Sequence, residues 1–315
     1  MIERNEYNLK SKGGTELSIA ELERYVGEEA LAPFQIIPSR FRGLKQGLIP
    51  IYWVHDTEND PEMKHLENGG WAKFELLIFV SNWQMQRFIE RYDIPWSRCV
   101  VVPNACVPFQ SIRPISTDGP IRFIYHTTPH RGLNVLAAAF EKLAETEDVH
   151  LDVYSSFSIY GWAERDKPYE LLYERLRNNP KVTYHGARPN EEVREALLNT
   201  HFFVYPCTWP ETGCRALIEA MMAGVMCSVT NYGCLYETAS RIASTYQFQD
   251  DPKDLAGVTY QLMSSLVQYA RSVSADDINL IRQDIHKKAT EAYSWDARAM
   301  EWRGLFEQIR RRRGV

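Results

Sequence analysis

Long apolar runs, an excess of basic residues and an apolar leader are all missing from this sequence. No stretch approaches the roughly 18 consecutive apolar residues that suggest a membrane-crossing helix. Lysine and arginine number 36 against 41 acidic residues, and the net charge of -5 argues against a general nucleic-acid-binding protein. The first residues, Met-Ile-Glu-Arg-Asn-Glu, lack the apolar segment of a secretory signal peptide. We therefore expect a cytoplasmic protein with no strong signal for nucleic-acid binding.

Metal-binding patterns are also missing. The chain contains 6 cysteines, none of which forms a Cys-x-x-Cys pair, and their spacing fits no standard zinc site. Reduced cysteines are therefore the default expectation. One acidic run lacks the glycine that a calcium loop needs, so we expect a solvated loop at Asp56, Glu58, Asp60 and Glu62. The sequence predicts no metal site.

What the chain does contain is a regular alternation of apolar strands and helix-like segments through its middle. With 44% hydrophobic residues, a chain of 315 residues can fill the cores of two domains. Strands are expected at 121–125, 150–154, 182–184, 202–205 and 226–230. Their alternation with helices predicts an α/β fold with a parallel, doubly wound sheet. Ligands of such sheets bind beyond the carboxyl ends of the strands.

A proline- and serine-rich segment at 110–120 is typical of a linker between two domains. We predict an N-terminal domain at 1–115, a second domain at 118–280, and helices at 281–315 that pack back across both. Residues 1–12 are too polar for a buried central strand. The N-terminal domain is therefore expected to be reduced, with its first strand missing or at the sheet edge.

The most informative stretch is 209–224, which reads Trp-Pro-Glu-Thr-Gly-Cys-Arg-Ala-Leu-Ile-Glu-Ala-Met-Met-Ala-Gly. An apolar strand leads into it, and a helix is expected from near Cys214 to the final glycine. The N–H groups and positive end of that helix favour an anion, which Gly213 allows to approach the backbone closely. Glu211 and Glu219 can then both serve one elongated ligand. A nucleotide-sugar, with hydroxyl-rich groups on either side of a diphosphate, has that shape.

Two glutamates at this spacing also occur by chance, and many helices that follow strands have a similar apolar face for packing alone. The complete order of strand, proline, Glu, Thr-Gly, amphipathic helix, Glu and Gly is more specific. It resembles the donor-site signature of the retaining family 4 glycosyltransferases, which the segment 225–238 continues as far as Glu237. The resemblance implies the GT-B fold, in which two Rossmann-like, doubly wound domains face a cleft.

The resemblance also assigns residues to the donor. It implies that Glu211 binds hydroxyls of the transferred sugar and that Glu219 binds the ribose. Arg131 stands at the family's Lys-Gly position, where a cation neutralises the donor diphosphate. His126 stands nearest to the place of a further family arginine. The remaining expected donor contacts are Thr127, Thr128, Gly186, Ala187, Thr212, Gly213 and Cys214.

On the N-terminal side, His55 ends an apolar strand where family 4 enzymes carry a histidine. The resemblance implies that His55 hydrogen-bonds the transferred sugar or the acceptor, whereas a histidine that only caps the strand is the alternative. The segment 101–104, Val-Val-Pro-Asn, matches the family's Val-Ile-Pro-Asn, and Gly13 and Gly14 stand in its Gly-Gly loop. The expected catalytic residues are therefore Glu211, His55 and Arg131.

The implied reaction transfers a sugar from a nucleotide-diphosphate donor, with UDP or GDP favoured, to an acceptor hydroxyl. Configuration is retained, and neither a metal nor another cofactor is expected. A glycan, a lipid-linked sugar and a small molecule stay open as acceptors. A GT-B sugar-nucleotide 2-epimerase and a catalytically silent nucleotide- or carbohydrate-binding subunit are the alternatives.

The chain ends in a basic cluster. We expect a solvated, frayed tail or a contact with anionic lipid at the inner face of a membrane, made by Arg310, Arg311, Arg312 and Arg313.

Overall fold

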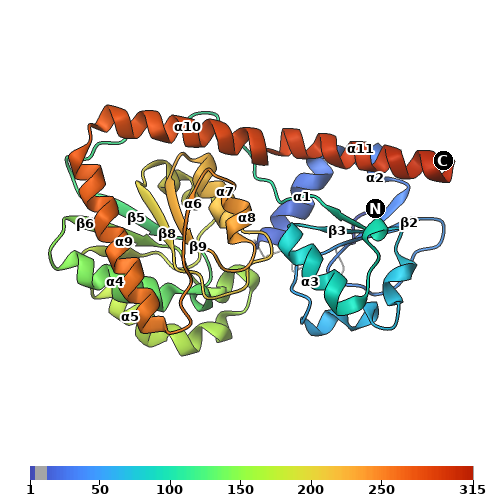
Figure 1. Ribbon diagram of the computed structural model, residues 1–315, viewed down its shortest axis with the longest axis horizontal. Coiled ribbons are helices and arrows are strands. Elements are labelled where there is room, and N and C mark those ends of the chain that lie inside the picture. The colour runs from blue at the N-terminus through green and yellow to red at the C-terminus, as the bar shows by residue number, and fades with distance from the viewer. Residues whose placement is uncertain (4–12, 315) are drawn as a thin grey trace.

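The computed structural model describes residues 1–3 and 13–314, which form two α/β halves joined by long C-terminal helices (Figure 1). Each half is built on one parallel sheet, and the central strands are short, apolar and buried, whereas the edge strands β4 (Cys99–Val101), β7 (Val182–Tyr184) and β10 (Ser244–Tyr246) are partly exposed. The predicted fold class, with two Rossmann-like domains in the GT-B arrangement, is confirmed.

The N-terminal half contains a four-stranded parallel sheet in the order β1-β2-β3-β4. Its strands are β1 (Phe34–Pro38), β2 (Ile49–Trp53), β3 (Leu76–Phe79) and β4 (Cys99–Val101). Its helices are α1 (Gly14–Val26), α2 (Glu28–Leu31) and α3 (Asn82–Tyr92). Ile2 forms an isolated parallel bridge with Ile36, at the β1 edge of the sheet. The rest of the polar segment discussed above, 4–12, lies outside the described residues.

The second half contains a six-stranded parallel sheet in the order β10-β9-β8-β5-β6-β7. Its strands are β5 (Ile121–Tyr125), β6 (Val149–Val153), β7 (Val182–Tyr184), β8 (Phe202–Tyr205), β9 (Met226–Thr230) and β10 (Ser244–Tyr246). The strand order reverses between β5 and β8, which pair side by side. A crevice opens at such a switch point, beyond the carboxyl ends of the strands.

Helices of the second half follow the strands as the alternation predicts. They are α4 (Leu133–Ala144), α5 (Glu170–Arg177), α6 (Asn190–Leu198), α7 (Arg215–Met222) and α8 (Leu235–Ala239). Helix α7 begins after Cys214, as expected, and Gly224 takes a positive φ of 73° just past its end. The buried face of α7 packs on the sheet, so the loop before it is held at the strand ends.

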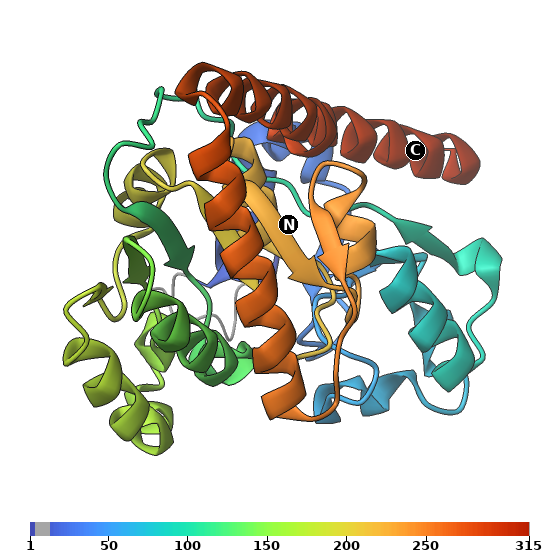
Figure 2. The same ribbon diagram turned by 60° about the vertical axis from the view of Figure 1, so that its left-hand side comes forward.

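Three long helices complete the chain: α9 (Pro252–Ser272), α10 (Ala275–Tyr293) and α11 (Trp295–Arg313). Figure 1 shows α10 and α11 running end to end along one side of both halves. Figure 2, turned by 60°, shows α9 crossing the face of the second half. Helix α11 belongs to the core of the N-terminal half, where Phe306 stacks on Phe34 and Trp302 contacts Trp53 edge to face.

The basic C-terminus differs from the expected frayed tail. Helix α11 continues through Arg313, because Ile309 is buried in the core and Gly314 closes the helix with a positive φ of 69°. Arg310 donates hydrogen bonds to the carbonyl oxygens of Glu29 and Ala30, and Arg313 pairs with Glu75. Arg311 also lies 3.5 Å from Glu307 of the same helix, so three of the four arginines have partners within the protein. In the described ranges, no helix has the length and apolar character needed to cross a membrane.

Candidate active site

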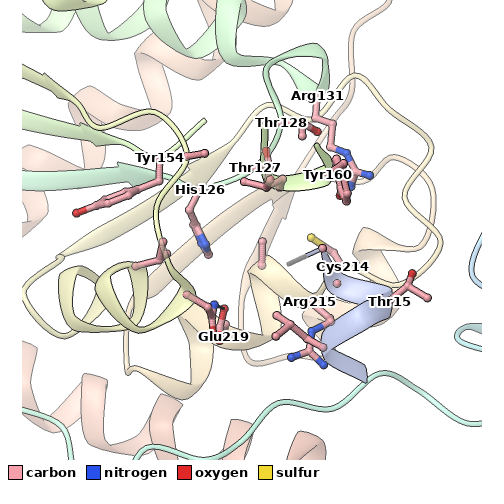
Figure 3. Close-up of a pocket in the computed structure, with 18 of the residues that line it drawn as sticks. Thr15, His126, Thr127, Thr128, Arg131, Tyr154, Tyr160, Cys214, Arg215 and Glu219 are labelled. Carbon is pink, nitrogen blue, oxygen red and sulfur yellow. Dashed lines mark hydrogen bonds between the residues drawn. The ribbon is translucent and has the colours of Figure 1, made fainter. Parts of the chain in front are cut away.

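A cavity of about 230 Å³ lies between the two halves, at the carboxyl ends of the strands. Figure 3 shows side chains from both halves pointing into it. It brings together every site residue expected from the sequence: Gly13, Gly14, His55, Thr127, Thr128, Arg131, Gly186, Ala187, Glu211, Thr212, Gly213, Cys214 and Glu219. The fold therefore collects residues that are up to 206 positions apart in the chain, between Gly13 and Glu219.

The loop between β8 and α7 forms one wall of this cavity. Gly213 is required there by close packing: a Cβ atom would lie 2.7 Å from Asn104 Nδ2 and 2.7 Å from Val80 Cγ2. Asn104 Nδ2 donates a 2.8 Å hydrogen bond to the Gly213 carbonyl oxygen. Cys214, the N-cap of α7, makes no capping hydrogen bond through its side chain among the described residues. The start of α7 lines the cavity, so N–H groups of its first turn are placed to bind an anion there.

Glu211 forms the centre of a buried polar cluster in that loop. Its Oε1 accepts hydrogen bonds from Arg131, at 2.5 Å, and from the Tyr205 hydroxyl, at 2.7 Å. Burial opposes the positive charge of Arg131, but the carboxylate of Glu211 outweighs it, so the pKa of Arg131 lies well above its ordinary value. Arg131 Nε is buried without a partner in the part of the chain that the structure describes. One N–H of this fixed guanidinium is therefore left to bind an anion.

The turn that carries Arg131 is held against the same loop. Gly132 has a φ of 109°, and a Cβ atom there would collide with the carbonyl oxygen of Pro206. Only glycine combines this left-handed backbone with so close an approach. The Arg131 turn and the end of β8 are thereby locked together, which explains the short Arg131–Glu211 contact.

Glu219 lies one to two turns into α7 and also faces the cavity. Its carboxylate accepts from Arg194 at 3.0 Å and from Asn190 Nδ2 at 3.1 Å, and its side chain is 8% exposed. Arg194 in turn lies 3.8 Å from the centroid of the Phe109 ring. The carboxylate is thus oriented by two donors and keeps acceptor capacity for ligand hydroxyls.

The loop after β5 supplies neutral polar groups. His126 Nε2 and Thr128 Oγ1 are buried with no hydrogen-bond partner within the described ranges. Burial lowers the pKa of His126 to about 4, so the imidazole is neutral at pH 7. His126 therefore does not replace a second arginine as a cation. Buried polar atoms of this kind are normally satisfied, so they mark this wall as ligand-binding.

His55 reaches the cavity from the N-terminal half and contacts the loop between β8 and α7. Its carbonyl oxygen accepts a 2.7 Å hydrogen bond from Thr212 Oγ1, and its Nε2 is buried without a partner in the described chain. Burial and the charge of Arg215 lower the pKa of His55 to about 3, so this ring is also neutral. Gly13 approaches Tyr160 so closely that a Cβ atom would collide with the ring.

The far end of the cavity lies beside β6 and β7. Tyr154 stacks on His185 with ring centroids 4.1 Å apart and an interplanar angle of 3°. Asp152 holds His185 through a 2.9 Å contact with Nε2. Gly186 and Ala187, which the sequence predicts as donor contacts, follow directly and line this end.

Several residues in or beside the cavity were not expected from the sequence. Asn190 lines the cavity and Arg194 pairs with Glu219; both are on a different helix from Glu219, and only the tertiary structure brings them to it. Arg215 sits inside the motif, but the pattern gives no reason for its charge. Tyr154 lies in the segment 153–156, which only weakly matches the family's glycine-rich loop after a strand, so the sequence did not single it out as a donor contact.

The acidic run after His55 is not the solvated loop that the sequence predicts. Glu58 is buried and lies 3.3 Å from Arg87, and Asp56 forms a 2.9 Å ion pair with Arg40. Glu58 is drawn inward, whereas Asp56, Asp60 and Glu62 stay partly exposed and are paired with arginines from a neighbouring segment. The described residues contain no group of three potential metal ligands.

Comparison with known proteins agrees with this architecture. Residues 111–262, just under half of the chain, match the family model of group 1 glycosyl transferases. No curated protein matches the sequence.

Solved structures that resemble the protein include a glycosyltransferase from Rickettsia africae, with 14% identity, a TM-score of 0.65 and 95% of each chain covered. Sucrose-phosphate synthase from Thermosynechococcus elongatus has 16% identity and a TM-score of 0.61, covering 94% of this chain and 78% of that one. HepE from Anabaena, in complex with UDP and glucose, has 13% identity and a TM-score of 0.61, covering 95% and 84%. At these identities the likeness establishes the GT-B fold.

Proposed function

We propose that this protein is a glycosyltransferase that moves a sugar from a nucleotide-diphosphate donor, UDP- or GDP-linked, to an acceptor hydroxyl with retained configuration. The observation that carries the proposal is the single cavity in which Glu211, Arg131 and Glu219 surround the start of α7. The match to group 1 glycosyl transferases covers most of this wall, and HepE, of the same fold, is described with UDP and glucose.

The chemistry follows from where charge develops. Breaking the glycosyl–phosphate bond puts negative charge on the leaving diphosphate. The free Nε of Arg131 and the N–H groups that open α7 are fixed before the reaction and stabilise that charge. This arrangement supports departure of the diphosphate by electrostatic stabilisation from protein groups.

The environment of Glu211 supports retention by same-face attack. Its Oε1 is held by Arg131 and Tyr205, and the positive charge beside it makes the carboxylate a poor nucleophile. We propose that Glu211 instead orients Arg131 and binds sugar hydroxyls. The leaving phosphate then takes the acceptor proton, and His55 contacts the sugar or acceptor from the opposite half.

A thermal-shift panel tests the donor site. UDP, GDP, ADP, TDP and their common sugar conjugates are added to the wild type, to Glu219→Ala and to a control variant, Glu195→Ala, which changes an exposed glutamate of α6. A nucleotide at a hundred times its Kd adds about 2.7 kcal/mol of stability, a shift of a few degrees for this size. One base that shifts the wild type and the control, but shifts Glu219→Ala weakly, identifies the donor. No shift by any nucleotide would sink the proposal.

With the donor known, acceptors are screened by release of the nucleoside diphosphate. The anomeric configuration of the product is then read by NMR. A product of inverted configuration would contradict the proposed same-face mechanism while leaving the transferase function intact.

A further inference from the structure

Arg215 is a buried cation in the cavity wall that the reaction described above does not use. It is the first residue of α7 and follows the Gly213–Cys214 segment directly. Figure 3 shows it beside the start of α1, the helix that carries Thr15 and belongs to the N-terminal half. Its side chain therefore leaves the donor half and enters the other one.

The contacts of Arg215 all lie in the N-terminal half. Its guanidinium donates to both carboxylate oxygens of Glu21, at 2.9 and 3.3 Å, to Ser18 Oγ at 3.1 Å and to the Ala105 carbonyl oxygen at 2.5 Å. The side chains of the ion pair are 10% and 14% exposed. Because the fork of N–H groups is occupied by Glu21, Arg215 is not free to neutralise a diphosphate.

Glu21 also receives a hydrogen bond from the indole N–H of Trp295, the first residue of α11. One carboxylate thus joins α1, α7 and the helix that packs along the N-terminal half. A two-point Arg–carboxylate contact fixes orientation as well as distance. Buried pairs of this kind add geometric definition more than net stability.

The loop beside Arg215 is tied to the same half on two further sides. Thr212 donates to the His55 carbonyl oxygen, and Asn104 donates to the Gly213 carbonyl oxygen. The three residues 212, 213 and 215 thus connect the donor loop to three separate segments of the N-terminal half. Of these three connections, the Arg215–Glu21 ion pair is the one made by charged side chains.

We propose that Arg215 is a positioning residue, whose ion pair with Glu21 holds the donor loop in register with His55 across the cleft. This inference rests on the proposed function, because register matters only if donor and acceptor meet between the halves. The placement of the donor sugar relative to the acceptor then depends on an ion pair that contacts neither the sugar nor the acceptor.

The test compares Arg215→Met and Arg215→Lys with the wild type. Two quantities are measured: the Kd of the nucleoside diphosphate selected by the panel, by calorimetry, and transfer per nucleotide-binding site. Because misplacement by about 1 Å can cost roughly 100-fold in rate, Arg215→Met should lose transfer on that scale with little change in Kd. Arg215→Lys should recover part of it. Equal transfer in Arg215→Met and the wild type would overturn the proposal.

A double variant separates positioning from folding. Glu21→Gln with Arg215→Met removes both charges, so neither is left buried alone, and the glutamine can still accept from Trp295. Thermal stability should return toward the wild type because the unpaired charge is gone, while transfer stays low. Transfer that recovers together with stability would show a purely structural role.

A second contact between the halves serves as the matched control. Glu237 of α8 accepts hydrogen bonds from the backbone N–H groups of Asn82 and Trp83 at the start of α3. Glu237→Ala should lower transfer less than Arg215→Met, because Glu237 holds only the start of α3 from α8, whereas Arg215 directly follows the Gly213–Cys214 segment of the donor loop. An equal loss in both would contradict a specific role for Arg215. Failure of the proposed function would look different, since the wild type would then bind no nucleotide.

Discussion

The two halves of the molecule meet at one cavity, but they build their walls differently. The second half presents charged side chains that are already paired, Glu211 with Arg131 and Glu219 with Arg194. The N-terminal half presents glycine backbone and the neutral ring of His55. Charge is therefore concentrated on the side proposed to hold the diphosphate, and it is fixed in place by partners from neighbouring loops and helices.

The difference matters because a charged side chain that is already paired is held in a fixed orientation. The uncharged groups of the N-terminal half can contact a ligand only through its shape and through hydrogen bonds. A diphosphate carries its own charge and gains most from fixed N–H donors in a low-dielectric site. A sugar or acceptor hydroxyl needs directional hydrogen bonds instead. Apart from Arg215, whose guanidinium contacts lie in the N-terminal half, changes in the second half should therefore alter nucleotide affinity or departure of the diphosphate. Changes in the N-terminal half should alter transfer alone.

The largest effect is expected from Glu211→Ala. It removes the orienting partner of Arg131 and leaves that cation buried alone, so transfer should fall about 100- to 1,000-fold and stability by about 3–5 kcal/mol. Transfer assays and urea denaturation measure the two effects. The exposed-site variant Glu195→Ala is the control and should change neither, since surface pairs contribute about 0–1 kcal/mol. Normal transfer in Glu211→Ala would show that the reaction does not need the Glu211–Arg131 pair, and the proposed role of charge in the second half would be wrong.

His55→Ala tests the neutral wall. Removal of His55 leaves a buried hydroxyl of the sugar or acceptor without its partner, which costs about 1–3 kcal/mol if the hydrogen bond forms in the transition state and should lower transfer roughly 5- to 100-fold. Nucleotide Kd, measured by calorimetry, should stay at the wild-type value because His55 lies on the other half. A matching loss of nucleotide affinity would break the division between the halves.

Glu219→Ala should have a smaller and different effect. Removal of an acceptor for the ribose should raise the nucleotide Kd by about tenfold, while transfer at saturating donor changes little, because such binding is equal in ground and transition states. Steady-state kinetics with varied donor separate the two constants. A lower transfer rate at saturating donor, with an unchanged nucleotide Kd, would show that Glu219 acts in the chemical step rather than in donor binding.

The smallest effect concerns pH and the buried histidine His201, which lies outside the cavity. Burial lowers its pKa to about 4, from an ordinary value of about 6.5. The folded protein therefore binds fewer protons than the unfolded chain in this window, so stability falls as pH drops from 6.5 toward 4. His201 Nδ1 accepts from the Arg122 N–H at 3.1 Å, and Nε2 lies 3.0 Å from the Ser116 carbonyl oxygen.

His201→Gln can keep both hydrogen bonds but cannot titrate. Urea midpoints at pH 5 and pH 7.5 should therefore differ less in this variant than in the wild type. An unchanged difference would mean that the acid sensitivity arises from the other histidines whose pKa is lowered by burial. Those are His55 and His65 in the N-terminal half and His126, His130 and His150 in the second half.

Local pattern predicted much of the second half. The strand at 121–125 and the start of α7 agree with the sequence because apolar runs, prolines and glycines act over a few residues. The same logic failed for 310–313 and for the acidic loop at 56–62. Their states depend on Glu75, Arg40 and Arg87, which the chain pattern does not place nearby.

The candidate site shows the same division. The motif placed Glu211, Gly213 and Glu219 on one loop and helix, because strand, loop and helix are set by neighbouring residues. The partners Arg194 and Glu21 reach that motif from other helices, and no spacing rule connects them to it. Fold class and the donor motif could be read from the order of residues. The pairing of charges and the register of the two halves were decided only by tertiary packing, because electrostatic contacts depend on distance in space rather than along the chain.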